Sequence, residues 1–354
     1  MIKRNAEEIL RRALTDNPVV FLNGARQTGK STLVKTIPDA GDTGQYVTFD
    51  DVGMLAGAKS DPVGFLHSLR LPVVLDEVQR VPDLFLTIKA EVDRSRKAGR
   101  FLLTGSANAL LLPHVADSLA GRMEIVTLWP FSQGELIGRK EDFIDVMFSS
   151  TFPARAVPAL DRRSLIERIV TGGYPEAVAR TDETRRAAWF GSYVTTILQR
   201  DVRDLARIEG LTALPRLLTM LAARSSTLLN VAQLSNNAAL PQSTLKRYLT
   251  LLETTYLIKF LPAWSGNVGK RLMKTPKVLL CDTGVLGYLL GINASNLFQQ
   301  PTSLGSMLET FIAMEISKQI TWSAAQPTLY HFRTLRGQEV DLVLEHRSGK
   351  ILGI

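Results

Sequence analysis

The sequence contains little cysteine and histidine. Among its 354 residues there is a single cysteine, Cys281, and there are four histidines, none of them paired at metal-ligand spacing. One cysteine excludes a disulfide framework within the chain and also a cysteine-rich zinc site. We therefore expect Cys281 to be a buried packing residue.

Long apolar runs are also absent. The apolar stretch over 278–292 is interrupted by Asp282 and by glycines, and no uninterrupted run is long enough to cross a bilayer. Residues 1–16 mix Lys, Arg and Glu with Ile and Leu, which is typical of an amphipathic helix, whereas a secretory signal needs an apolar core. These features predict a soluble, cytoplasmic protein without a membrane partner.

Length and charge set further bounds. The length favours two or three domains, and the 45% hydrophobic content is enough to build a core. The formal net charge is +8, and residues 181–280 alone carry 14 Lys and Arg against 6 Asp and Glu, so the remainder is neutral overall. This basic middle third predicts a surface for the phosphates of a polynucleotide. The alternative, that these basic residues only keep surface helices soluble, stays open.

One motif organises the N-terminal third. The apolar run 19–22 is followed by Gly24, four further residues and then Gly29-Lys30-Ser31, which matches the P-loop pattern. Glycine at both ends lets backbone N–H groups curl closely around a phosphate, Lys30 can reach the β- and γ-phosphates, and the Ser31 hydroxyl can bind Mg²⁺. The strand before the loop argues against a chance glycine-rich turn. The predicted nucleotide-binding residues are Gly24, Ala25, Arg26, Gln27, Thr28, Gly29, Lys30, Ser31 and Thr32.

An acidic pair follows another apolar strand. The run 71–75 leads directly into Asp76 and Glu77, which stand 46 and 47 residues after Lys30. At the carboxyl end of a parallel strand, Asp76 can hold the Mg²⁺ shell, and Glu77 can orient or deprotonate the attacking water. The alternative is that the pair only caps a helix, but the presence of a P-loop in the same chain favours the catalytic interpretation.

Two further catalytic candidates are weaker. The strand 101–104 ends in polar residues, of which Thr104 or Ser106 could sense the γ-phosphate or hold the water, or else a Ser or Asn here caps the next helix. Arg122 could approach the developing phosphate charge, in its own site or in a neighbour's. The alternative for Arg122 is a solvated or ion-paired surface residue.

The N-terminal pattern also predicts a fold. From residue 18 to about residue 128, apolar runs alternate with helical patterns, which is typical of a mainly parallel sheet covered by helices. The candidate strands are 19–23, 45–49, 73–75, 101–104 and 124–128.

Four motifs, taken in order, resemble one family. They are Gly-Ala-Arg-Gln-Thr-Gly-Lys-Ser-Thr at 24–32, Leu-Asp-Glu-Val-Gln-Arg at 75–80, Leu-Thr-Gly-Ser-Ala-Asn at 103–108 and Leu-Ala-Gly-Arg at 119–122. Together they resemble the prokaryotic AAA-like P-loop ATPases that carry a DUF4143 C-terminal region, and the resemblance covers almost the whole chain. It implies an ASCE-type ATPase in which Lys30, Ser31, Asp76 and Glu77 take the roles given above.

The middle of the chain is expected to be helical. Residues 136–170 predict helices broken at Pro153 and Pro158, and 189–205 predicts a long helix. The turn Gly-Gly-Tyr-Pro-Glu at 172–176 is either a helix terminator or a hinge near the nucleotide.

The basic region predicts a helix-turn-helix unit over 211–262, ending in a strand of a wing at 257–261. Pro241 suits the entry of its third helix. Lys246 and Arg247 near the start of that helix are then placed to meet phosphates or guanine edges. As an alternative, winged-helix modules also serve as protein-binding or spacer elements.

The C-terminal stretch resembles the opening of a PD-(D/E)XK nuclease core, with Glu309 on a helix and Asp341 on a strand. That chemistry also needs a Glu-x-Lys on the next strand, and the sequence stops at Ile354 before one. We therefore expect a truncated or shortened form without nuclease activity, or a degenerate structural fold. Glu309 and Asp341 are candidate metal ligands only if the chain continues.

The predicted fold is α/β: an ASCE-type P-loop NTPase with a parallel sheet and helices on both faces, followed by a winged-helix domain and a partial PD-(D/E)XK nuclease-like α/β domain. The expected divisions are an ATPase domain over 1–135, a helical connector over 136–205, the winged helix over 206–275 and the nuclease-like region over 276–354.

The predicted function is Mg²⁺-dependent ATP hydrolysis, with ATP and Mg²⁺ bound at the P-loop and DNA as the candidate partner. The alternative is a nucleotide-gated scaffold that binds a protein, hydrolyses ATP slowly and ignores nucleic acid. A small-molecule kinase is disfavoured, because the pair Asp76 and Glu77 suits a positioned water better than an acceptor substrate. Nothing in the sequence sets the oligomeric state.

Overall fold

The computed structural model describes residues 2–37, 44–106, 119–149, 160–202, 212–299, 301–334 and 336–354. The chain divides into two units, Met1–Phe131 and Ser132–Ile354. Ala107 and Asn108, the expected breaks at Pro153 and Pro158 and the end of the helix expected over 189–205 lie outside the described residues.

The first unit is built on a five-stranded sheet in the order β2-β3-β4-β1-β5, and every pair in it is parallel. Its strands are β1 Val19–Asn23, β2 Gln45–Thr48, β3 Val73–Asp76, β4 Phe101–Gly105 and β5 Met123–Thr127. The predicted parallel sheet is therefore confirmed, with strand limits within two residues of those expected. β4 lies between β1 and β3, so the P-loop strand and the acidic strand are not direct neighbours.

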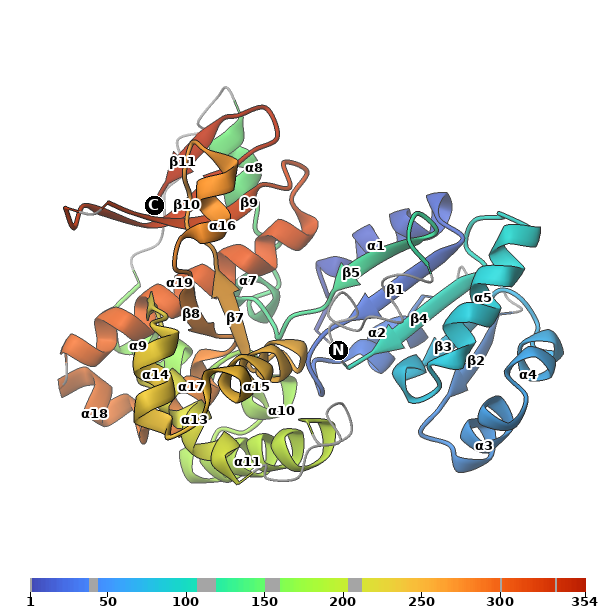
Figure 1. Ribbon diagram of the computed structural model, residues 1–354, viewed down its shortest axis with the longest axis horizontal. Helices are drawn as coiled ribbons and strands as arrows, with labels where there is room; N and C mark the ends of the chain where they lie inside the picture. Colours follow the sequence, from blue (N-terminus) through green and yellow to red (C-terminus); the bar gives the residue numbers. More distant parts are fainter. Residues whose placement is uncertain are drawn as a thin grey trace. The chain divides into compact units, whose positions relative to one another are not determined.

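Helices cover both faces of this sheet (Figure 1). Alternate residues of one strand point to opposite faces, and β1 is buried on both. Val20 and Leu22 pack with α1 and α2, whereas Val19 and Phe21 pack with the helices of the other face. The helices are α1 Ala6–Asp16, α2 Lys30–Lys35, α3 Val52–Ser60, α4 Pro62–Ser68 and α5 Asp83–Arg94, with a 3₁₀ turn at Val78–Arg80.

The second unit begins with helices. They are α7 Gln133–Leu136, α8 Phe143–Phe148, α9 Arg162–Thr171, α10 Pro175–Val178 and α11 Glu183–Thr196, which continues into a π-helical turn at Ile197–Asp201. Then follow α13 Ala213–Ala222, β6 Thr227–Leu228, α14 Val231–Ala238, α15 Gln242–Thr254, β7 Ile258–Leu261, α16 Val268–Met273 and β8 Lys277–Leu280. β8 pairs antiparallel with both β6 and β7. This strand was expected with the C-terminal region, but it belongs to the sheet of the preceding helices.

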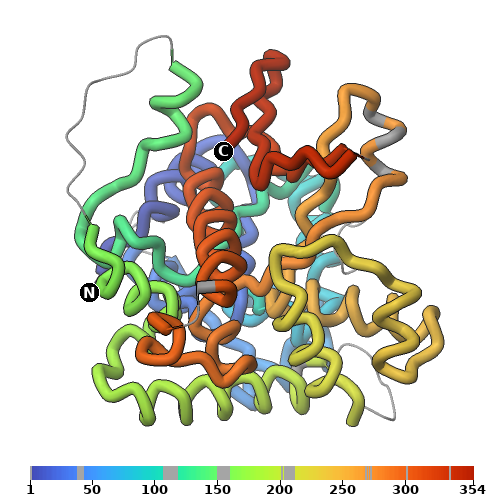
Figure 2. Tube along the Cα trace, turned by 90° about the vertical axis from the view of Figure 1, so that its left-hand side faces the viewer, coloured from blue at the N-terminus to red at the C-terminus, as the bar shows by residue number. Residues whose placement is uncertain are grey.

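The C-terminal part of the second unit is a long helix with an antiparallel sheet. It comprises α17 Thr283–Leu290, α18 Ala294–Gln299, α19 Pro301–Trp322, β9 Thr328–Arg333, β10 Glu339–Glu345 and β11 Ile351–Gly353, and the sheet order is β11-β10-β9. Figure 2 shows α19 standing upright, with the β9–β10 hairpin beyond one end and α11 near the other. Ala313 and Ile316 of α19 pack against Leu342 and Leu344 of β10. Within the described ranges no helix is both long enough and apolar enough to span a bilayer.

The Gly-Gly turn ends α9 at a packed junction. Gly172 has a φ of 68°, and a Cβ there would lie 2.3 Å from Oδ1 of Asp282. The Asp282 carboxylate caps α17 and also accepts a hydrogen bond of 2.8 Å from the Gly173 N–H. These contacts bear out the helix-terminator interpretation of this turn. Cys281 beside it is buried, as expected for a packing residue.

Candidate nucleotide-binding site

The loop between β1 and α2 has the backbone that its glycines predict. Gly24 has a φ of 147°, and a Cβ on it would meet the Leu128 carbonyl oxygen at 2.2 Å. Gly29 has a φ of 93°, which is also in the region that side chains disfavour. Any other residue at Gly24 would push the loop away from β5, so the tight curve depends on this glycine.

Lys30 lies inside the curve of this loop. Its ammonium donates hydrogen bonds to the carbonyl oxygens of Gly24, at 2.9 Å, and Ala25, at 2.8 Å, and the residue is only 4% exposed. The positive charge is thus held among the backbone groups that the motif assigns to phosphate binding. Of the remaining predicted loop residues, Gln27 and Thr32 are exposed and Thr28 is buried, with its hydroxyl 2.9 Å from the Ala25 carbonyl oxygen.

Asp76 accepts hydrogen bonds from three hydroxyl groups. The Ser31 oxygen lies 3.1 and 3.0 Å from the two carboxylate oxygens, the Tyr46 hydroxyl lies 2.7 Å from Oδ2, and the Thr104 hydroxyl donates to Oδ1. The carboxylate is almost fully buried. Burial and the neighbouring Asp76 both raise the pKa of Tyr46 far above its usual value, so the phenol stays protonated and keeps donating.

Glu77 stands next to this network with an unusual backbone. Its φ of 61° and ψ of 41° are left-handed, which is rare for a residue other than glycine. Its N–H donates to the Thr104 hydroxyl at 3.1 Å, and its Oε2 accepts from Gln79 Nε2 at 2.5 Å and from Ser106 Oγ at 3.2 Å. The acidic pair therefore divides: Asp76 faces Ser31, while Glu77 faces Gln79 and Ser106.

The structure brings most residues predicted for the nucleotide site together and leaves one of them out. Lys30, Ser31, Asp76, Glu77 and Ser106 all lie at the carboxyl edge of the parallel sheet, because each follows or adjoins the end of a strand. This common edge is where parallel α/β folds bind ligands.

Arg122 is the exception, and its expected role in the site of its own chain is wrong. It precedes β5, whose first residue pairs with the first residue of β1, so Arg122 lies at the amino edge, about 15 Å from the other end of the strands. There its guanidinium forms an ion pair with Asp93, with Nε 2.5 Å from Oδ1. This pairing matches the alternative of an ion-paired surface residue. The carboxylate of Asp93 raises the pKa of Arg122.

Three contributors were not predicted. Tyr46 reaches Asp76 from β2, Gln79 reaches Glu77 from the turn after β3, and Arg4 donates to the Thr28 carbonyl oxygen at 2.7 Å and to the Trp129 carbonyl oxygen at 2.6 Å. Only Gln79 had a signal in the sequence, because it stands within the acidic motif. Tyr46 and Arg4 act across sequence separations of 30 and 24 residues, which no local pattern reveals.

The other predicted sites lie in the second unit. Lys246 and Arg247 are exposed on α15. Glu309 and Asp341 do approach each other, but the Lys277 ammonium lies between them, 2.7 Å from Glu309 Oε1 and 3.4 Å from Asp341 Oδ1, and 2.6 Å from Glu339 Oε1 as well. Across the described ranges, no group of three or more His, Cys, Asp and Glu side chains is arranged to hold a metal ion.

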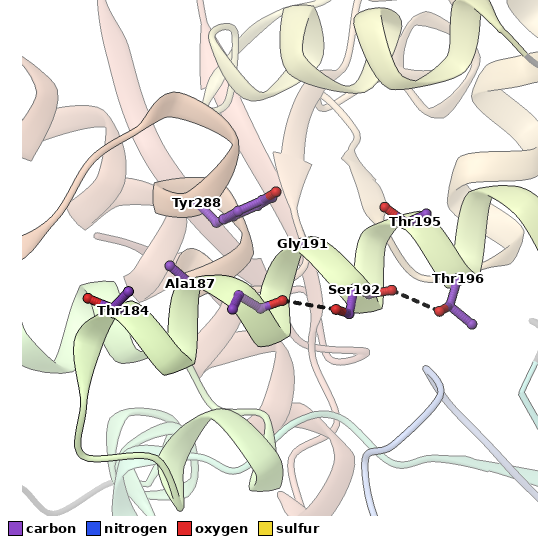
Figure 3. Close-up of a pocket in the computed structure, with 8 residues that line it drawn as sticks. Thr184, Ala187, Gly191, Ser192, Thr195, Thr196 and Tyr288 are labelled. Carbon is purple, nitrogen blue, oxygen red and sulfur yellow. Dashed lines mark hydrogen bonds between the residues drawn. The ribbon is translucent and has the colours of Figure 1, made fainter.

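A shallow hollow of about 750 Å³ lies along α11, beside Tyr288 (Figure 3). Its lining is made of small and hydroxyl side chains, and Ser192 and Thr196 donate to carbonyl groups of their own helix. No acid, imidazole or cation lines it, so it offers none of the groups that phosphate chemistry needs.

Comparisons with known proteins agree with this arrangement. The model of an AAA domain matches residues 16–137, one domain of unknown function (DUF8612) matches 162–296, and another (DUF4143) matches 304–354. Uncharacterized proteins of Mycobacterium tuberculosis and Mycobacterium bovis are each 34% identical over 99% of this chain and 73% of their own length. An uncharacterized protein of Methanocaldococcus jannaschii is 23% identical over 86% of this chain and 68% of its own.

Among solved structures, a Walker-type ATPase of Pyrococcus abyssi superposes with a TM-score of 0.50 at 16% identity, covering 82% of this chain and 96% of that one. At this identity the likeness concerns the fold, which is the α/β fold of P-loop NTPases. With the AAA and DUF4143 matches and the mycobacterial relatives, it shows that the chain belongs to the AAA-like P-loop ATPases with a DUF4143 C-terminal region.

Proposed function

We propose that the chain binds and hydrolyses ATP at the carboxyl edge of its parallel sheet. The observation that carries this proposal is the meeting of the P-loop with the acidic strand, where the Ser31 hydroxyl lies 3.1 and 3.0 Å from the oxygens of Asp76. Lys30 and Glu77 flank that contact. A charged loop for phosphates and a carboxylate for a water are thus supplied by adjacent segments.

The residues present fit a magnesium ion. Mg²⁺ prefers oxygen ligands and takes one or two from the protein, and Ser31 and Asp76 supply a hydroxyl and a buried carboxylate side by side. When bound with nucleotide, the ion would offset the charge of the phosphates. The chain's own groups do the rest: Lys30 exchanges its two carbonyl partners for phosphate oxygens, and Glu77 orients a water and accepts its proton.

Phosphate release measures this proposal directly. Wild-type protein should release inorganic phosphate from ATP in the presence of Mg²⁺, Lys30→Ala should lose nucleotide affinity, and Glu77→Gln should retain affinity but lose turnover by at least about a hundredfold. Transfer of phosphate to a metabolite instead of water, or full turnover in Glu77→Gln, would contradict the proposal.

We further propose that the second unit presents a DNA-binding module of the winged-helix type. The order α13-β6-α14-α15-β7-α16-β8, with β8 between β6 and β7 in the sheet, is the support for this assignment. The second helix of the α14–α15 pair carries an exposed row that includes Lys246 and Arg247, next to Gln242 and Ser243. A row of donors and cations on such a helix suits phosphates and base edges in a groove.

DNA retention at varied salt tests this module in the full chain. The affinity should fall steeply with salt, and the double variant Lys246→Ala/Arg247→Ala should bind more weakly, with a salt slope lower in magnitude by up to about 2. Arg163→Ala/Lys350→Ala, which removes two exposed charges elsewhere in the same unit, is the matched control. Absence of DNA binding at low salt and of DNA stimulation of the ATPase would favour the nucleotide-gated protein scaffold instead.

For the C-terminal part we propose a nuclease-like fold with a structural role in this chain. The succession of α19, β9, β10 and β11 supports the fold assignment. The acids that would hold a metal instead form ion pairs with Lys277, whose ammonium lies among them, and this supports the structural role. Incubation of the chain with Mg²⁺ or Mn²⁺ and a plasmid should leave the DNA uncut.

A further inference from the structure

The turn that follows Glu77 is anchored at both of its ends. Val78 is fully buried in the core of the first unit. Arg80 donates to the Phe49 carbonyl oxygen at 2.6 Å and to Asp50 at 2.8 Å. Gln79 stands between these two anchors, in a 3₁₀ turn that starts directly after Glu77. The turn therefore has little freedom, and it returns the Gln79 side chain towards the carboxylate that precedes it.

The Gln79 amide can face Glu77 in only one way. An ionised carboxylate accepts hydrogen bonds but cannot donate them, so Nε2 must point to Glu77, where it lies 2.5 Å from Oε2. The opposite end, Oε1, is then buried without a hydrogen-bond partner among the described residues. It packs against Gly105, where a Cβ would lie 2.8 Å from it.

Two costly features thus accompany one contact. A left-handed backbone at a residue with a long side chain and an unsatisfied buried carbonyl are both disfavoured, and such features gather at functional sites. Here both occur at the contact between the Gln79 amide and Glu77. Ser106 Oγ accepts from the same Gln79 nitrogen at 3.0 Å and donates to the same carboxylate oxygen at 3.2 Å, which closes a triangle around Oε2.

We propose that Gln79 is the positioning residue for Glu77 in ATP hydrolysis. Its amide, with Ser106, fixes the carboxylate through Oε2 and leaves Oε1 to accept the proton of the attacking water. This inference rests on the proposed ATPase function, and Gln79 itself touches neither water nor phosphate in this role.

The variant Gln79→Ala tests the inference through kinetics that a merely structural role would not change. Its kcat should fall about tenfold or more, while its affinity for a fluorescent ATP analogue with Mg²⁺ stays within about twofold of wild type. Gln79→Glu, which keeps the shape but loses the donor, should show the same loss of kcat.

Two comparisons make the test specific. Gln45→Ala removes a glutamine at the start of β2, whose other end pairs with Asp76. The Gln45 Oε1 accepts a hydrogen bond from the Arg70 N–H, and this variant should leave kcat unchanged. In a Glu77→Gln background, adding Gln79→Ala should reduce the residual rate no further, because a positioning residue acts only through the group it positions. Circular dichroism and thermal unfolding establish that each variant is folded.

An unchanged kcat, a faster kcat, or a loss that adds fully to that of Glu77→Gln would overturn this inference. These outcomes differ from a failure of the proposed function. If wild type releases no phosphate, or Glu77→Gln is as active as wild type, the ATPase proposal itself fails. If wild type is active, Glu77→Gln is inactive and Gln79→Ala matches wild type, only the role of Gln79 is wrong.

Discussion

Ser31 donates its hydroxyl to Asp76, which follows it by 45 residues in the chain, with oxygen–oxygen distances of 3.1 and 3.0 Å. This single contact joins the phosphate loop to the acidic strand across β4, which lies between their two strands. The two oxygen groups that suit a magnesium ion are therefore in place in the protein chain alone.

Removing the Ser31 hydroxyl should weaken nucleotide binding only when magnesium is present. We expect Ser31→Ala to lose about tenfold or more in affinity for ATP with Mg²⁺, because one oxygen ligand is lost, and to change little for ATP with EDTA. Fluorescence titration with a labelled nucleotide measures both conditions. Ser68→Ala, at an exposed serine whose hydroxyl donates to the Phe65 carbonyl oxygen of α4, is the matched control. Equal losses with and without the metal would speak against a magnesium ligand.

Arg122 should be dispensable for catalysis within one chain. Arg122→Ala removes the ion pair with Asp93 at the amino edge of the sheet, where no phosphate is bound in our proposal. We expect kcat per chain to stay within about twofold of wild type in dilute solution. A large loss of kcat that grows with protein concentration would instead show that Arg122 reaches the site of a neighbouring copy.

Lys277 should be important for stability. Its ammonium is almost fully buried among Glu309, Glu339 and Asp341, so Lys277→Met removes the cation that contacts all three carboxylates, and only Glu339 keeps a second ion-pair partner, Arg333. We expect a loss of about 3 kcal/mol in the free energy of unfolding, at the low end for a buried pair because the acids remain partly exposed. Lys318→Met, which removes a buried lysine that forms an ion pair with Glu315, is the comparison variant. Urea unfolding measures both variants.

The same cluster predicts how that loss depends on pH. The hydrogen bond from Lys277 lowers the pKa of Glu339, so its contribution is present above the usual pKa of glutamate and is lost as the pH falls through the lowered value. Burial instead raises the pKa of Glu309, so this acid is neutralised first on acidification. The stability difference between wild type and Lys277→Met should therefore shrink below about pH 4. A difference that is constant from pH 7 to pH 3 would contradict this account.

Gly172 should tolerate no side chain. Its positive φ and the 2.3 Å distance from an added Cβ to Oδ1 of Asp282 combine strain with a clash against a buried carboxylate. We expect Gly172→Ala to lower the free energy of unfolding by about 2 kcal/mol or more, whereas Gly138→Ala, with a similar φ but open space around it, should cost less. Equal effects in thermal unfolding would show that the backbone strain alone matters.

Much of the site could be predicted from the chain because its chemistry resides in contiguous residues. The loop curves where the sequence has Gly24 and Gly29, just before Lys30 and Ser31. Glycine is required at these two positions because the backbone takes a positive φ at both and approaches Leu128 at Gly24. The parallel strands were visible for a similar reason, because strands buried on both faces are short unbroken apolar runs. The end of α9 could be predicted for the same reason, because Gly172 marks it within the local sequence.

What the tertiary structure alone decided is which distant residues meet. The strand order places Tyr46 and Thr104 on Asp76 from the two strands that flank β3, and no local spacing encodes that order. It also puts Arg122 at the amino edge, although the sequence motif suggested the active site. Lys277 joins the C-terminal acids only because β8 packs beside them. Such meetings depend on how whole elements bury their apolar faces, and this is a property of the folded chain rather than of any segment.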